Sequence, residues 1–172
     1  MQPTAFTIKS NSGIIKQLTT LVDVVVPNTR NAFQVRAIWD TGATATVITE
    51  NVVKALGLLP TGMSHVNTAN GSTIQNTYIV DIVLPNGLIV KDVTVTGATA
   101  LSGGSEVLIG MDIITLGDLS ITHHKGATCM SFRIPSLHEI DYVKNINFKL
   151  TPNLPAGKPG SNITPKKKKK KK

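Results

Sequence analysis

The fold is decided by the segment Val35-Arg36-Ala37-Ile38-Trp39-Asp40-Thr41-Gly42-Ala43-Thr44-Ala45-Thr46-Val47-Ile48. The apolar residues before Asp40 are typical of a buried strand, so the carboxylate emerges where that strand ends. Gly42 allows the backbone to turn tightly and to bring an N–H close to the carboxylate, and the Thr41 hydroxyl can brace the loop. The segment therefore predicts a carboxylate held in a tight loop at the end of a buried strand.

Outward from this segment, most of the chain consists of short runs rich in β-branched residues and separated by turn residues, which predicts an all-β fold. The predicted strands cover residues 18–26, 33–39, 73–84, 88–96, 119–123 and 128–134. The turn sequences between strands are Pro27-Asn28, Asn70-Gly71, Pro85-Asn86-Gly87 and Lys125-Gly126. Such turns favour hairpins, so several strand pairs are expected to be antiparallel neighbours.

Two short helices are predicted, over residues 49–58 and 111–116, and Gly57 and Gly117 are expected to end them. The chain has no internal repeat, and its 172 residues with 41% hydrophobic composition fit one domain with one core. We expect three parts. Residues 1–17 are an N-terminal segment and a candidate dimer-interface strand, residues 18–135 are the folded domain, and residues 136–172 are an extended or disordered tail.

The positive charge of the chain is concentrated at its end. The formal net charge is +8, and removing the seven lysines of Lys166–Lys172 from the 18 basic residues leaves 11 against 10 acidic ones. The remaining Lys and Arg residues are scattered, so no basic nucleic-acid-binding face is expected on the folded domain. The polylysine run is expected to bind polyanions weakly, whatever it is attached to.

The cysteine count and the apolar runs exclude other classes of protein. A single cysteine, Cys129, cannot form an internal disulfide, which favours a cytoplasmic location. The first residues lack the pattern of a signal peptide, and no apolar run approaches the ~20 residues of a membrane span. No zinc-site spacing connects this cysteine with the histidines of the chain, which are His65, His123, His124 and His138. We therefore expect no membrane partner, no metal and no cofactor.

The loop sequence Asp40-Thr41-Gly42-Ala43 resembles the active-site signature of retropepsin-like aspartic proteases. In that family, a β-hairpin flap closes over the substrate, and two hydrophobic residues and a glycine lie in a strand beside the aspartate loop. Residues 66–74 resemble the flap, and Val107–Ile114 resemble the second element. The residues singled out in these two elements are Ala69, Asn70, Gly71 and Ser72 in the flap, and Leu108, Ile109 and Gly110 beside the loop.

The resemblance covers roughly residues 18–134 and implies a closed, β-barrel-like acid-protease lobe that hydrolyses polypeptides. It implies that Asp40 is catalytic and that Thr41, Gly42 and Ala43 form the active-site loop. Retroviral members usually have an acidic residue two positions after the motif glycine and a basic residue after the second glycine. This chain has Thr44 and Met111 there, so it is nearer to cellular or bacterial retropepsin-like domains, and the bracing of the dimer and the choice of peptides stay open.

Peptide hydrolysis without a covalent intermediate needs one carboxylate to deprotonate a water and another to protonate the carbonyl oxygen or the leaving nitrogen. No aspartate other than Asp40 is followed by Thr-Gly or Ser-Gly. We therefore expect the second carboxylate to come from a second copy of the chain, in a two-fold homodimer. Two such carboxylates would share one proton, so activity should favour acidic to mildly acidic pH.

Two other functions are alternatives to an endopeptidase. An aspartyl-phosphate enzyme is disfavoured, because it needs a parallel α/β sheet and further acidic residues for magnesium. A non-catalytic module of the same fold, which binds peptides or holds a dimer, is the more serious alternative because a fold does not guarantee activity. Retention of Asp40, Thr41 and Gly42 favours the enzyme.

Overall fold

The computed structural model describes residues 2–11, 13–68 and 71–147 of the chain. The flap residues Ala69 and Asn70 and the polylysine run therefore lie outside the described residues. The chain divides into two compact units, Met1–Leu137 and His138–Lys172, and each is described by itself.

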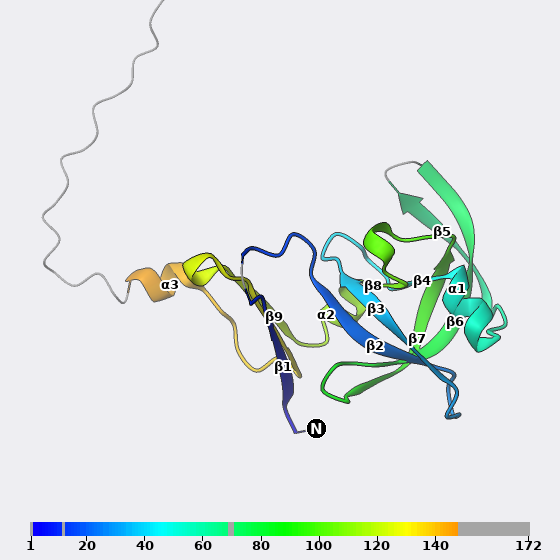
Figure 1. Ribbon diagram of the computed structural model, residues 1–172, viewed down its shortest axis with the longest axis horizontal. Helices are drawn as coiled ribbons and strands as arrows, with labels where there is room; N and C mark the ends of the chain where they lie inside the picture. The colour runs from blue at the N-terminus through cyan, green and yellow to red at the C-terminus, as the bar shows by residue number, and fades with distance from the viewer. Residues whose placement is uncertain (1, 12, 69–70, 148–172) are drawn as a thin grey trace, which may run out of the picture. The chain divides into compact units, whose positions relative to one another are not determined.

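The larger unit is built around a seven-stranded sheet that closes into a barrel (Figure 1). Its strands, in hydrogen-bonding order, are β2 (Thr19–Val25), β3 (Ala32–Trp39), β8 (Val107–Ile109), β4 (Val47–Thr49), β7 (Ile89–Ala98), β6 (Gly71–Val83) and β5 (Gly62–Thr68). Because β2 also pairs with β6, the six strands from β2 to β6 form a ring, and β5 lies outside it. The predicted all-β, barrel-like lobe is confirmed.

Two of the predicted turns contain a residue with a positive φ. Asn28 has a φ of 60° between β2 and β3, and Gly87 has a φ of 79° between β6 and β7. The Gly87 N–H closes its turn by donating to the Leu84 carbonyl at 2.8 Å. The pairs β2–β3, β5–β6 and β6–β7 are antiparallel, as predicted, whereas β3–β8 and β4–β7 are parallel pairs that hairpin signals cannot predict.

The two predicted helices are present but shorter. Helix α1 (Glu50–Leu56) ends at Gly57, which adopts the left-handed conformation with a φ of 62°. Helix α2 (Met111–Ile114) follows β8 directly. Thr49 occupies the N-cap position of α1, but its hydroxyl donates to the Glu106 carboxylate instead of capping the helix. The side chain of Thr49 therefore ties α1 to the segment before β8.

A second sheet of three strands packs against the barrel. It consists of β1 (Thr4–Lys9), β10 (Cys129–Ile134) and β9 (Asp118–Thr122), with β10 in the middle and antiparallel to both neighbours. Phe6 and Phe132 on this sheet contact Trp39, with ring centroids 5.9 and 4.9 Å from the indole. The indole Nε1 donates to Thr20 Oγ1 at 3.1 Å, in a buried position. This aromatic cluster fixes the residue that immediately precedes Asp40.

Strand β1 lies in the N-terminal segment that was considered for a dimer interface. It pairs along its length with β10 of the same chain, from Thr4 opposite Ile134 to Lys9 opposite Cys129. Strand β1 belongs to the larger unit, so this unit includes residues before residue 18, where the sequence predicts the folded domain to begin. The polar alternation of β1 gives little signal on its own, and only its partner strand explains its structure.

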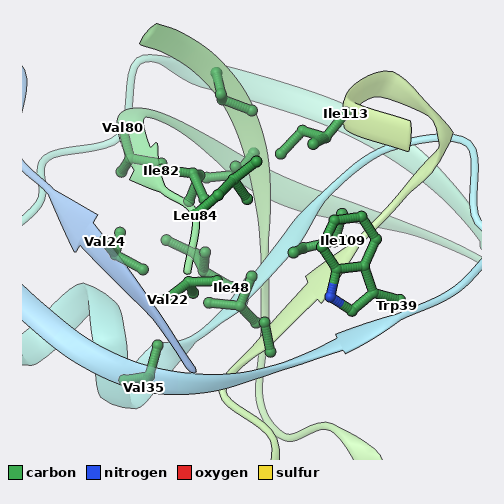
Figure 2. Close-up of a cluster of buried hydrophobic side chains, with 14 of the residues drawn as sticks. Val22, Val24, Val35, Trp39, Ile48, Val80, Ile82, Leu84, Ile109 and Ile113 are labelled. Carbon is green, nitrogen blue, oxygen red and sulfur yellow. The ribbon is translucent and has the colours of Figure 1, made fainter. Parts of the chain in front are cut away.

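The barrel interior is filled by branched aliphatic side chains from every strand of the ring. Figure 2 shows Trp39 and Ile109 in this core, and the two residues are partners in the parallel β3–β8 pair. Ile48 of β4, Ile113 of α2 and Ile109 are all almost completely buried. The strands that carry the Asp40 loop are thus held by core packing on one side and by the aromatic cluster on the other.

The end of β10 is fastened by Asp118, the first residue of β9. Its carboxylate accepts hydrogen bonds from the Ser136 hydroxyl, from the Arg133 guanidinium and from the Leu137 N–H. These three donors, with Ser136 contributing most, hold the pKa of Asp118 well below its usual range. The Asp118 carboxylate, which binds Ser136 and Leu137 at the end of the larger unit, therefore stays charged in acidic solution.

In the smaller unit, the described residues contain one helix, α3 (Tyr142–Asn147). The Asp141 carboxylate accepts from the Val143 N–H at 2.9 Å and from the Lys144 N–H at 3.2 Å, which caps the helix. This helix differs from the extended or disordered tail expected from residue 136 onward. Throughout the described residues, no helix has the length and apolar character needed to cross a membrane.

Candidate active site

Asp40 lies at the end of β3 in a tight loop. Its N–H donates to the Ile109 carbonyl at 3.0 Å, and its Oδ1 accepts from the Gly42 N–H at 2.8 Å. The Ala43 N–H returns to the Asp40 carbonyl at 3.3 Å and closes the turn. A β-carbon on Gly42 would lie 3.2 Å from Asp40 Oδ1, so a larger residue would crowd the carboxylate. The loop holds the half-buried carboxylate in one orientation.

The Thr41 side chain does not brace this loop within one chain. It is exposed, and its hydroxyl makes no hydrogen bond to the part of the chain that the structure describes. The bracing contacts come instead from the second predicted element, which passes directly beside the loop. Met111 N–H donates to the Ala43 carbonyl at 2.8 Å, and Asp112 N–H donates to the Thr44 carbonyl at 3.2 Å.

Gly110 is required by the close approach of these two segments. A β-carbon at this position would lie 2.6 Å from the carbonyl carbon and from the carbonyl oxygen of Ala45, both backbone atoms that cannot rotate away. The two residues before Gly110 lie in different environments. Ile109 is fully buried in the barrel core, whereas Leu108 is half-buried and lines the groove beside the loop.

Thr46 and Asp112 connect the two segments through side chains. Asp112 Oδ2 accepts from the Thr46 N–H at 2.9 Å, and Asp112 Oδ1 accepts from the Thr46 hydroxyl at 2.7 Å. The same hydroxyl oxygen accepts from the Gly110 N–H at 3.2 Å. The Thr46 carbonyl accepts from the Thr96 N–H at 3.2 Å. Thr46 is completely buried, and its polar atoms are all satisfied.

A groove of about 650 Å³ runs between the aspartate loop and the β5–β6 hairpin. Strands β5 and β6 pair from Gly62 opposite Thr77 to Thr68 opposite Gly71, and the hairpin extends beyond the barrel in Figure 1. Gly71 has a φ of 119°, and Ser72 pairs with Asn67. The groove is lined by Gly42, Ala43, Thr44, Ala45, Val47, Ser64, His65, Val66, Asn67, Thr73, Gln75, Thr96, Gly97, Ala98, Ala100, Leu101 and Leu108.

The groove is nearly uncharged. None of its described lining residues is Asp, Glu, Lys or Arg, and His65 is the one titratable side chain among them.

Sequence reasoning missed two parts of the site. It set Asp112 aside because Thr-Gly does not follow it, although its place two residues after Gly110 was the available signal. It also missed the groove wall formed by Thr96 to Leu101, because that wall depends on the parallel pairing of β4 with β7. No group of three or more potential metal ligands occurs among the described residues.

A comparison with known protein families finds a match in the region of the chain that builds this site. The family model described as "gag-polyprotein putative aspartyl protease" matches residues 26–115, which is more than half of the sequence. This range contains the Asp40 loop, the β5–β6 hairpin and the Gly110 segment. No curated protein matches the chain.

Three solved structures are similar to parts of the chain. A retropepsin-like aspartic protease from Rickettsia conorii has 15% identity and a TM-score of 0.47, with coverage of 78% of this chain and 97% of that one. The EIAV protease, complexed with the inhibitor HBY-793, has 19% identity and a TM-score of 0.46, with coverage of 61% and 91%. The simian foamy virus protease has 19% identity and a TM-score of 0.37, with coverage of 54% and 89%.

The assignment rests on the family match, whose residues are those that build the loop, the hairpin and the brace described above. The chain belongs to the gag-polyprotein aspartyl protease family and is a retropepsin-like, aspartic-type endopeptidase.

Proposed function

We propose that the active enzyme is a two-fold homodimer in which Asp40 and its copy in the second chain form one catalytic dyad. The observation that carries this proposal is that each chain supplies a single aspartate in a Thr-Gly loop. In the described part of the chain, that carboxylate accepts a hydrogen bond from Gly42 and from no second carboxylic acid. Acid–base hydrolysis needs two such groups, so a second chain has to provide the other.

In this dimer, one Asp40 is ionised and deprotonates the attacking water, and the other is protonated and donates to the peptide carbonyl oxygen. Like charges about 3 Å apart cannot both ionise, a case for which aspartic proteases are the standard example. The Gly42 N–H donates to Oδ1 and fixes the orientation of the carboxylate. The Thr41 hydroxyl, exposed and without a partner in the described residues, is available to the second chain.

The substrate is a polypeptide that lies extended in the groove between the aspartate loop and the hairpin. The neutral lining of the groove supports this assignment. The flap is the β5–β6 hairpin, which includes the predicted flap residues Gly71 and Ser72, and it closes over the bound strand and excludes water during the reaction. The other two predicted flap residues, Ala69 and Asn70, lie outside the described residues. Thr41, Gly42 and Ala43 form the active-site loop, and Leu108, Ile109 and Gly110 support it from beneath.

The first test is cleavage of a denatured protein from acidic to neutral pH by the wild-type chain and by the Asp40→Asn variant. We expect cleavage at acidic to mildly acidic pH by the wild type alone. If neither chain cleaves while both are folded dimers, the non-catalytic binding module becomes the better description. Cleavage by Asp40→Asn at the wild-type rate would remove the carboxylate from the mechanism.

Mixing the two chains tests the shared dyad. At a fixed total concentration and one wild-type chain in ten, random pairing leaves about 1% of dimers with two intact aspartates, whereas independent chains would retain about 10% of the activity. Activity near about 1% supports one site for each dimer. Activity near about 10% means that a single chain carries a complete site.

A further inference from the structure

We propose that Asp112 is a positioning residue for the catalytic loop, and that its carboxylate acts on this loop through Thr46. This inference rests on the proposed function of Asp40. It starts from two backbone hydrogen bonds that join the aspartate loop to the segment after β8, from Met111 N–H to the Ala43 carbonyl and from Asp112 N–H to the Thr44 carbonyl. The side chain of Asp112 adds a second connection between these segments.

The carboxylate of Asp112 is saturated with donors. Oδ1 accepts from the Thr46 hydroxyl at 2.7 Å and from the Ile113 N–H at 2.9 Å, and Oδ2 accepts from the Thr46 N–H at 2.9 Å. None of the ion pairs among the described residues includes Asp112. Its negative charge is thus compensated by three hydrogen-bond donors and not by a cation.

This arrangement requires a carboxylate and excludes an amide of the same shape. An asparagine side chain has one oxygen acceptor and one NH2 donor. If the NH2 group replaces Oδ2, it faces the Thr46 N–H; if it replaces Oδ1, it faces the Ile113 N–H. In either orientation two donors oppose each other, so one backbone N–H loses its partner. Only an acceptor with two oxygens satisfies all three donors.

The hydrogen bonds of Thr46 connect Asp112 to the catalytic loop and to the groove. Its hydroxyl accepts from the Gly110 N–H, and its carbonyl accepts from the Thr96 N–H, whose residue lines the groove. Thr46 is six residues after Asp40, and the loop between them is anchored at Ala43 and Thr44 by Met111 and Asp112. Displacement of Asp112 therefore loosens the C-terminal half of the loop whose N-terminal half carries the catalytic carboxylate.

The test compares Asp112→Asn with wild type in the dimer, using the cleavage assay and Asp40→Asn as the inactive reference. We expect kcat to fall by about 10- to 100-fold while KM changes by no more than about 2-fold, because a small misplacement of reacting groups acts on the transition state. Thr46→Ser, which keeps the hydroxyl, should retain near wild-type kcat. Thr46→Val, which removes it, should resemble Asp112→Asn.

Asp118→Asn is the matched control. Asp118 also accepts from several donors in the same unit, but its partners Ser136, Arg133 and Leu137 lie outside the catalytic loop. We expect this variant to lower the melting temperature and to leave kcat unchanged. If it lowers kcat as much as Asp112→Asn at an equal loss of stability, the effect is general destabilisation and the positioning role is refuted.

Two further measurements separate this inference from the proposed dyad. In the Thr46→Val/Asp112→Asn double variant, kcat should fall no further than in the more damaged single variant, because the two side chains act as one unit. Multiplied losses would refute the coupling. Amide hydrogen exchange at Thr46 and Gly110 should be faster in Asp112→Asn than in wild type or Asp118→Asn. Unchanged amide exchange in Asp112→Asn would refute the positioning role of Asp112. A wild-type chain without proteolytic activity would refute the proposed Asp40 dyad. In that case, the exchange rates at Thr46 and Gly110 would still test the role of Asp112.

Discussion

Substituting Gly110 by alanine should displace the Asp40 loop through steric contact alone. Gly110 has a φ of −94° and a ψ of −173°, an extended conformation that any residue adopts, so the backbone carries no penalty. The added β-carbon would lie 2.6 Å from both the carbonyl carbon and the carbonyl oxygen of Ala45. Ordinary contacts between such atoms are about 3.5 Å, so the two segments must separate by roughly 1 Å.

This separation has two measurable effects. Overpacking of this kind costs about 1–3 kcal/mol in the free energy of unfolding. The same movement pulls the Ala43 and Thr44 carbonyls away from Met111 and Asp112, and a shift of about 1 Å near reacting groups lowers kcat by roughly 100-fold. Thermal unfolding monitored by circular dichroism measures the first effect, and peptide cleavage at saturating substrate measures the second.

Gly87→Ala is the control for a glycine that is required for a different reason. Gly87 has a φ of 79°, and no atom lies within 4 Å of its added β-carbon, so the cost is backbone strain of about 1 kcal/mol in a distant turn. This variant should lose stability and keep kcat. The steric reasoning fails if Gly110→Ala has the melting temperature and the kcat of the wild type.

Three other outcomes are expected. Thr20→Val should cost about 1–3 kcal/mol, measured by denaturant unfolding, because it strands the buried indole N–H of Trp39. Asp118→Asn should be less stable than wild type above about pH 5; because the pKa of Asp118 is depressed in the folded state, its contribution shrinks as pH falls below about 4, so the difference between the two melting temperatures should decrease steadily on further acidification. Deleting Lys166–Lys172 should abolish retention on a heparin column and leave peptide cleavage unchanged.

The parts of the fold that sequence predicts are those with strong local signals. Residues 33–39 and 128–134 are β-branched or apolar runs with clear turns beside them, and they form β3 and β10 with bounds that differ by one residue at most. Strands β4 and β8 have three residues each, too few for a periodic pattern. Strand β1 is defined by its pairing with a segment more than a hundred residues away, which no local window contains.

The candidate site divides in the same way. Asp40 and Gly42 were predictable because each has a local reason, a carboxylate at a strand end and a tight turn, whereas Gly110 was predicted only from the resemblance to the family. The brace between Thr46 and Asp112 was not, because two ordinary polar residues 66 positions apart become partners only after β8 inserts between β3 and β4. A sequence motif therefore identified the reactive group of the site, but not the long-range hydrogen bonds that position it.

The position of β1 also affects the order in which the molecule is completed during synthesis. All strands of the ring lie between residues 19 and 109, so the barrel can form while the rest of the chain is still in the ribosome. Phe6 cannot reach its place beside Trp39 and Phe132 until residues 129–134 have emerged. Contacts of such sequence separation form late. The aromatic support behind Asp40 is thus assembled last, so a nascent chain does not carry a fully supported Asp40 loop until nearly the whole larger unit has been translated.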